Sequence, residues 1–187
     1  MSAHNLGKRF GPRWLFRHLE IELNAGDCLV VRGNNGSGKS TLLRVIAGLT
    51  EPSEGSVLNT AELGFSSIEL AVYPELTGAE HLELSSSLRG CPTRIDELLQ
   101  LVGIPESANR PTKQYSTGMK TRLKLAMAIQ HRPFLLILDE PAASLDGSGR
   151  EVLSAIVRQH LQHGVAVIAT NEGFESEFAT HQLMVGR

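Results

Sequence analysis

The hydrophobic positions of the chain follow two different periods. Residues 19–23 alternate apolar and acidic side chains, the two-residue period of a strand with one exposed face. Residues 28–31, 134–138 and 165–169 are almost wholly apolar, which is typical of strands buried on both faces of a parallel sheet. Between the apolar runs at 28–31 and 134–138, residues 73–132 carry apolar side chains at spacings of three and four, which predicts helices.

This order of elements predicts one α/β domain spanning residues 1–187. Its core, about residues 1–72 and 133–187, should hold a mostly parallel sheet with a small N-terminal antiparallel β region. The stretch of about residues 73–132 should form a helical subdomain inserted between the two halves of the core. A length of 187 residues suits one hydrophobic core rather than two.

The composition excludes some classes of protein. Hydrophobic residues make up 41% of the chain, charged residues 20%, and the formal net charge is -2, as in an ordinary soluble globular protein. No basic patch suggests nucleic acid, no run approaches the ~20 apolar residues that span a bilayer, and the N-terminus lacks the apolar stretch of a signal peptide. We therefore expect a cytoplasmic protein that reaches a membrane only through a partner.

Residues 33–41 read GNNGSGKST and fit the phosphate-loop pattern G-x-x-x-x-G-K-[ST]. Glycines let successive backbone N–H groups approach a phosphate closely, while Lys39 can reach the β- and γ-phosphates and Ser40 can bind Mg²⁺. The alternative is a chance glycine turn, but a buried strand before the loop and a helix after it are what the motif requires, so we expect the α/β domain to be of the P-loop NTPase type. The predicted nucleotide contacts of this loop are Gly33, Asn34, Asn35, Gly36, Ser37, Gly38, Lys39, Ser40 and Thr41.

Two adjacent carboxylates, Asp139 and Glu140, end the buried run at 134–138. Ligands collect at the carboxyl ends of strands in an open parallel sheet, so both should lie near the phosphate loop. Asp139 suits the coordination shell of Mg²⁺, and Glu140 can act as general base for the attacking water. The alternative is a solvated strand end with no function.

Further motifs resemble those of the ABC (ATP-binding cassette) transporter family. Residues 115–128 resemble the family signature, with Ser116 and Gly118 at its central serine and second glycine. Residues 144–146, which read SLD, resemble the family loop that follows the acidic pair and end in Asp146. Residues 8–11, which read KRFG, place Phe10 where the family has an aromatic residue against adenine. The resemblance implies an ATPase that uses ATP and Mg²⁺. It also implies a second copy of the chain in a head-to-tail dimer and an integral membrane permease as partner, at the inner face of the cell membrane.

Each of these matches has a purely structural alternative. Ser116 or Thr117 can be the N-cap of a helix, a role compatible with binding an anion. Phe10 can be a core residue rather than a purine contact. The segment from Thr77, which the resemblance places against the membrane partner, also reads as an ordinary helix with a Thr77–Glu80 capping box.

The sequence departs from the family at two positions. Ile68 stands where the family has a glutamine that contacts Mg²⁺ and the attacking water, and Glu69 is the nearest polar candidate to replace it. Asn171, after Thr170, stands where the family has a histidine near the γ-phosphate. Asparagine keeps an amide donor but cannot carry a proton. We therefore include Asn171 in the catalytic site beside Glu140 and expect slow hydrolysis.

The resulting prediction is the ATP-hydrolysing subunit of an ABC exporter, most similar to the small ATPases of cytochrome c maturation or haem export. Two alternatives stay open: an ABC ATPase that acts outside transport as a soluble assembly factor, and a nucleotide-dependent clamp that barely hydrolyses ATP. The transported substrate is not encoded in this chain, because a permease would select it.

Overall fold

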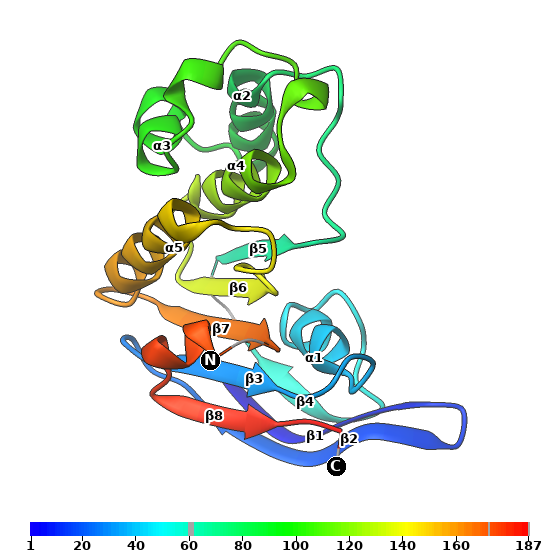
Figure 1. Cartoon of the computed structure of the whole chain (residues 1–187). Coiled ribbons are helices and arrows are strands. Elements are labelled where there is room, and N and C mark those ends of the chain that lie inside the picture. Colours follow the sequence, from blue (N-terminus) through cyan, green and yellow to red (C-terminus); the bar gives the residue numbers. More distant parts are fainter. Residues whose placement is uncertain (60–61, 172, 187) are drawn as a thin grey trace.

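The computed structural model describes residues 1–59, 62–171 and 173–186 of the chain (Figure 1). A parallel sheet has the strand order β5-β6-β7-β3-β8, and an antiparallel sheet has the order β2-β1-β4. The predicted fold class, a mostly parallel core with an N-terminal antiparallel region and inserted helices, is confirmed. The elements are β1 (Ser2–Phe10), β2 (Arg13–Glu22), β3 (Cys28–Arg32), α1 (Lys39–Ile46), β4 (Glu54–Leu58), β5 (Leu63–Ser67), α2 (Gly78–Arg89), α3 (Ile95–Leu101), α4 (Thr117–Ile129), β6 (Leu135–Asp139), α5 (Gly147–His160), β7 (Val165–Thr170) and β8 (His181–Met184), with three short 3-10 turns.

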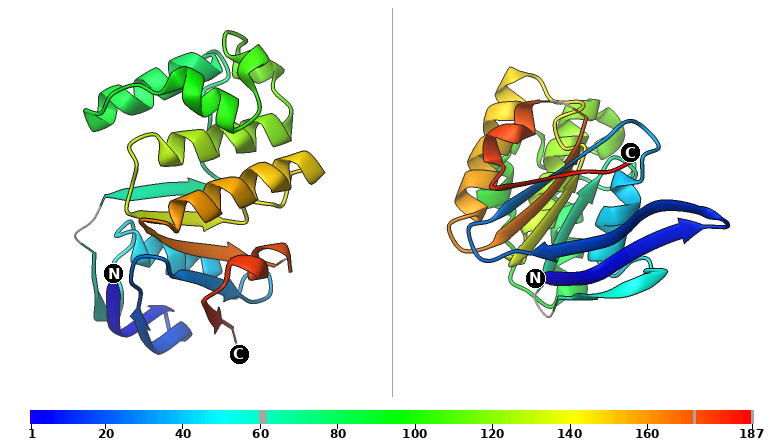
Figure 2. Two further views of the ribbon diagram at one scale, coloured as in Figure 1. Left: turned by 90° about the vertical axis from the view of Figure 1, so that its left-hand side faces the viewer. Right: turned by 90° about the horizontal axis from the view of Figure 1, so that it is seen from below.

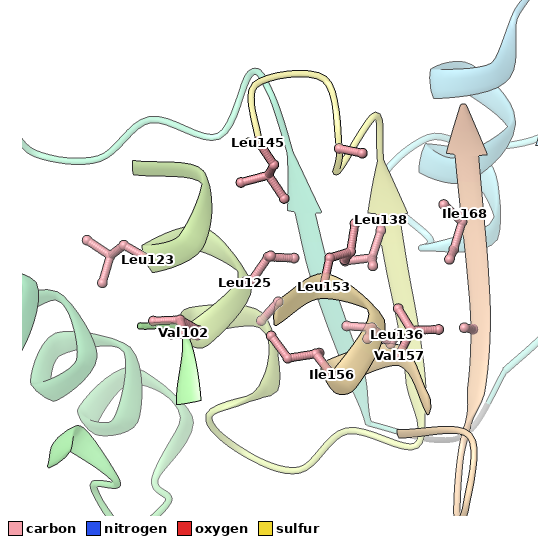
Figure 3. Close-up of a cluster of buried hydrophobic side chains, with 14 of the residues drawn as sticks. Val102, Leu123, Leu125, Leu136, Leu138, Leu145, Leu153, Ile156, Val157 and Ile168 are labelled. Carbon is pink, nitrogen blue, oxygen red and sulfur yellow. The ribbon is translucent and has the colours of Figure 1, made fainter. Parts of the chain in front are cut away.

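Both faces of the central strands β3, β6 and β7 are covered, which explains why residues 28–31, 135–138 and 165–169 are apolar at every position. Alternate residues of β6 face opposite sides: Leu136 and Leu138 pack in the cluster with α4 and α5, and Leu135 and Ile137 pack in the cluster with α1 and the antiparallel sheet. Figure 3 shows the first cluster, where Val157 of α5 lies over β6. Burial on both sides holds the strands, and therefore their ends, in fixed positions.

The helices of residues 73–132 and the antiparallel sheet lie at opposite ends of the molecule (Figure 2). Helix α2 begins with the capping box predicted from the sequence: the Thr77 hydroxyl accepts a hydrogen bond from the Glu80 amide at 3.2 Å, and the Glu80 carboxylate accepts one from the Thr77 amide at 2.7 Å. In the described part of the chain, no helix is both long enough and apolar enough to cross a bilayer.

The carboxyl ends of three central strands meet at one edge of the parallel sheet. Arg32 of β3 is in register with Thr170 of β7, and Asp139 of β6 is in register with Ala169 of β7. All the arrowheads of this sheet point to the same side in Figure 1, where helix α1 begins. This edge therefore gathers the phosphate loop and the acidic pair, although they are about a hundred residues apart in sequence.

Candidate functional site

The loop between β3 and α1 depends on glycine at two points. Gly33 has a φ of 156°, and a Cβ there would lie 2.5 Å from the Ser37 hydroxyl oxygen. Gly38 has a φ of 104°, and a Cβ there would lie 3.1 Å from the Cβ of Leu15 on β2. Other residues would be strained at both positions. Gly38 is also the N-cap of α1, a helix with no side-chain cap and no acidic residue in its first turn, so its N–H groups can receive an anion.

Lys39 is the centre of the site. Its buried side chain places Nζ 2.8 Å from the Gly33 carbonyl oxygen, 2.6 Å from Oδ1 of Asn171 and 3.4 Å from Oε1 of Glu140. The ammonium group thus connects the phosphate loop to the ends of β6 and β7. Of the other loop residues, Asn34, Asn35, Gly36 and Ser37 lie in the turn and Thr41 lies in the first turn of α1.

Glu140 is held at the site by its backbone. Its φ of 51° is unusual for a residue other than glycine, and its amide donates a hydrogen bond to the Ala169 carbonyl at 2.9 Å. Its Oε2 atom accepts a hydrogen bond from the backbone N–H of Asn171 at 3.2 Å. The carboxylate therefore faces the space above Lys39, where a general base for water attacking a terminal phosphate would be placed.

Asp139 and Ser40 come together beside this group, as a Mg²⁺ site requires. Burial raises the pKa of Asp139 above its usual value, while a hydrogen bond with Ser40 opposes that rise. Within the described residues, the Oδ1 atom of Asp139 is buried and has no hydrogen-bond partner. A buried, unpaired carboxylate oxygen next to a hydroxyl suits Mg²⁺, which binds one or two protein oxygens together with phosphate oxygens and water.

We expect Asp139→Asn to melt at a higher temperature than the unaltered chain at pH 7 without nucleotide, and to lose Mg²⁺-dependent hydrolysis. A carboxyl whose pKa is higher in the folded than in the unfolded chain contributes stability below its unfolded pKa and loses that contribution as the pH rises through its folded pKa. The advantage of asparagine should therefore appear as the pH rises above about 4 and vanish in acid. Melting curves across pH test this, with exposed Asp96→Asn as the control; an unaltered chain that melts higher at pH 7 would contradict it.

The second group of predicted residues lies in a different cavity. Ser116, Gly118 and Asp146 line a cavity of about 430 Å³ that shares no residue with the cavity lined by the phosphate loop and Asn171. Ser116 is the N-cap of α4, accepting a hydrogen bond from the Met119 amide at 3.2 Å, so its predicted capping role is confirmed. Asp146 is the N-cap of α5 and forms an ion pair with Arg122 at 2.9 Å. One chain therefore contains two separate regions that could bind an anion.

Phe10 is at the exposed end of the β1–β2 hairpin. Its side chain is 59% exposed and the ammonium of Lys8 lies 5.2 Å from the centre of its ring. The alternative that Phe10 is a core residue is therefore wrong. An exposed ring is available to stack on a purine, and that role stays a prediction.

The loop after β5 differs from what the family pattern would place there. Ile68 is 62% exposed. Its neighbour Glu69 forms an ion pair with Arg44 of α1, and Lys124 of α4 donates a hydrogen bond to the Ile68 carbonyl oxygen at 2.8 Å. Sequence reasoning found neither Arg44 nor Lys124, because a basic residue on a helix is ordinarily a solvated one.

Comparison with known proteins agrees with this geometry. The chain matches the ABC transporter family over residues 16–143. It is 34% identical over 171 residues to the cytochrome c biogenesis ATP-binding export protein CcmA of Hyphomonas neptunium, covering 91% of this chain and 88% of that one. It is 31% identical over 197 residues to the ABC transporter ATP-binding protein YxlF of Bacillus subtilis, covering 99% of this chain and 67% of that one. The dimeric bacterial ABC transporter cassette MJ0796 has the same fold, with a TM-score of 0.87 at 21% identity over 98% of this chain and 93% of that one.

The family is established because the family match over residues 16–143 includes the phosphate loop and the acidic pair, and the match to CcmA covers 91% of the chain. The chain belongs to the ABC transporter family, as an ATP-binding subunit with ATPase activity.

Proposed function

We propose that this chain binds ATP with Mg²⁺ and hydrolyses it to drive a separate integral membrane permease in export. One observation carries the proposal: Lys39, Asp139 and Glu140 meet at the carboxyl edge of the parallel sheet, with the uncapped start of α1 facing the same space. The loop N–H groups and Lys39 hold the triphosphate, and Glu140 takes a proton from the attacking water. Ser40 and Asp139 would hold Mg²⁺, which would supply positive charge to neutralise the phosphates.

The second cavity supports a head-to-tail dimer as the working form. Ser116 and Gly118 lie where α4 begins, and the start of a helix attracts anions. Within one chain this cavity is separate from the phosphate loop, so the γ-phosphate that it would bind belongs to ATP held by a second copy. Two identical copies related by a twofold axis would then enclose two nucleotides.

Exposed apolar side chains on and before α2 support a membrane protein as partner. Leu84 and Leu88 are four residues apart on α2, so they share one face of the helix, and Leu88 is 79% exposed. Ile68 and Tyr73, on the connection from β5 to α2, are also exposed. We propose that a cytoplasmic segment of the permease covers this surface, which would place the chain at the inner face of the cell membrane.

Capture from the native membrane tests the partner. We expect the tagged chain to retain one integral membrane protein after mild detergent extraction, and Leu84→Glu with Leu88→Glu to lose about 90% or more of it, because charges would be buried in an apolar contact. ATP binding should be unchanged in the same variant. The matched control is Glu151→Lys with Arg158→Glu, two exposed positions of α5. Capture of no integral protein by the unaltered chain would favour the soluble assembly factor.

We further propose that the exported substrate belongs to cytochrome c maturation, in which haem is the candidate. The support is the 34% identity to CcmA proteins of Hyphomonas neptunium and Haemophilus influenzae, each matched over 88% of its length. The identity of the permease captured from the membrane tests this proposal about the substrate. Haem-dependent stimulation of ATP hydrolysis by the purified complex is the expected result, and stimulation by other compounds but not by haem would overturn it.

A further inference from the structure

Two stretches of chain join the helices α2 to α4 to the parallel sheet. Residues 68–77 leave the end of β5, and residues 130–134 return to the start of β6. Figure 1 shows the first stretch as a long extended connection that begins at the edge where α1 lies. It is therefore the stretch that passes close to the ATP site before it reaches the helices.

The beginning of this connection is fixed from the helical side by Lys124. The ammonium of Lys124, in the middle of α4, donates hydrogen bonds to the carbonyl oxygens of Ser67 at 3.3 Å and Ile68 at 2.8 Å. The Leu70 amide also donates to the Ser67 hydroxyl at 3.2 Å, which closes a tight turn. Bonds from a charged donor are stronger than those from a neutral one, so α4 and this turn should move together.

The same turn is fixed from the phosphate-loop side by Glu69. Its carboxylate accepts a hydrogen bond from the guanidinium of Arg44, which lies in the last turn of α1. Helix α1 begins with Lys39 and Ser40, the residues that we propose to bind phosphate and Mg²⁺. A rigid helix of eight residues thus separates the nucleotide from the Arg44–Glu69 ion pair.

We propose that Arg44, Glu69 and Lys124 are positioning residues that set the orientation of α4 relative to the phosphate loop. The path runs from α1 through the Arg44–Glu69 ion pair and the Ile68 carbonyl to Lys124. Helix α4 carries Ser116 at its N-terminus, so its orientation decides whether that residue meets the γ-phosphate of the second copy. Backbone carbonyls and an ion pair thus join the ATP site to α4 at the point where the side chain of Ile68 points outward. The inference rests on the proposed head-to-tail dimer.

Charge reversal tests the ion pair. Arg44→Glu and Glu69→Arg are each expected to weaken dimerisation with Mg²⁺ and the non-hydrolysable analogue AMP-PNP about fivefold or more, and to lower kcat similarly. Nucleotide affinity, measured at a protein concentration where the chain is monomeric, should change less than about twofold. The double reversal restores the ion pair and should bring dimerisation and kcat back to within about threefold of the unaltered chain.

A matched control uses Lys113 and Glu75, an exposed ion pair of the same kind at 2.8 Å, whose reversal should change neither dimerisation nor kcat. Exposed ion pairs add little to folding, so melting temperatures should stay within about 2 °C in the variants of these two ion pairs. Lys124→Met keeps the aliphatic stem and should reproduce the loss seen with the single reversals.

Single reversals that dimerise and hydrolyse as the unaltered chain does, or a double reversal without rescue, would overturn the inference while leaving the ATPase intact. An unaltered chain that shows no dimer with AMP-PNP would overturn the dimer itself, and the inference with it.

Discussion

Glu140→Gln is expected to slow ATP hydrolysis by roughly 10²–10⁴-fold, the usual contribution of a general base. Glutamine has the same shape and can still accept the hydrogen bond that the backbone N–H of Asn171 gives to Glu140 at 3.2 Å. It cannot take a proton from water at neutral pH. Phosphate release at saturating ATP measures the loss.

The same variant should bind ATP at least as tightly as the unaltered chain does. The Glu140 carboxylate lies 3.4 Å from the Lys39 ammonium, where it offsets positive charge that would otherwise attract phosphate. Removing a negative charge so close to the triphosphate lowers electrostatic repulsion in a buried site. Titration with ATP at a low temperature, where turnover is slow, measures the affinity.

The control for this prediction is Glu151→Gln, a substitution of the same chemistry on the exposed side of α5, which should change neither quantity. Equal rates for Glu140→Gln and the unaltered chain would remove Glu140 from the reaction. That result would also favour the alternative in which the chain acts as a nucleotide-dependent clamp.

The parts of the site that are contiguous in sequence were predictable. Residues 33–41 follow a buried strand and begin a helix, and this order alone fixes where the backbone N–H groups point. Asp139 and Glu140 were predictable for a related reason. An apolar run marks a strand of a parallel sheet, and the ends of parallel strands meet at one edge.

The contacts between distant segments were not predictable, because sequence patterns describe elements and not how their side chains pair. Lys39 and Asn171 are 132 positions apart, and 2.6 Å separates their polar atoms. Lys124 donates to backbone carbonyls 56 and 57 residues away, which no pattern of side chains records. Phe10 shows the same limit, because phenylalanine is more often buried than exposed and its position in a strand does not record that its ring is 59% exposed.

Asn171→His is expected to raise kcat about tenfold to a hundredfold. In the unaltered chain both ends of the Asn171 amide contact the phosphate loop: Oδ1 accepts from Lys39 at 2.6 Å, and Nδ2 donates to Oδ1 of Asn35 at 2.5 Å. One of the two Nδ2 hydrogens of Asn171 is therefore already used within the protein, and only the other is available to a phosphate oxygen. A hydrogen bond to a charged group contributes about 1.5–3 kcal/mol, which corresponds to this range of rates if it forms in the transition state.

The pH dependence of kcat in Asn171→His distinguishes a histidine that takes part in the reaction from one that only packs better against the phosphate loop. An introduced histidine that donates a proton or a charged hydrogen bond to the γ-phosphate should give kcat a pH dependence near the usual histidine pKa of about 6.5. The unaltered chain has no histidine at this position and should lack that inflection. Measuring kcat between pH 5.5 and 8.5 for both chains provides the comparison.

Asn171→Ala completes the comparison because it removes both contacts and adds no donor. If the side-chain amide only holds the phosphate loop, Asn171→Ala should change the affinity for ATP and leave kcat within about threefold of the unaltered chain. If the amide supplies the single hydrogen bond to the γ-phosphate, alanine should lower kcat about tenfold or more. Equal kcat values for asparagine and histidine would refute the idea that this position limits the rate, and the slow step would then have to be sought at the Ile68 loop.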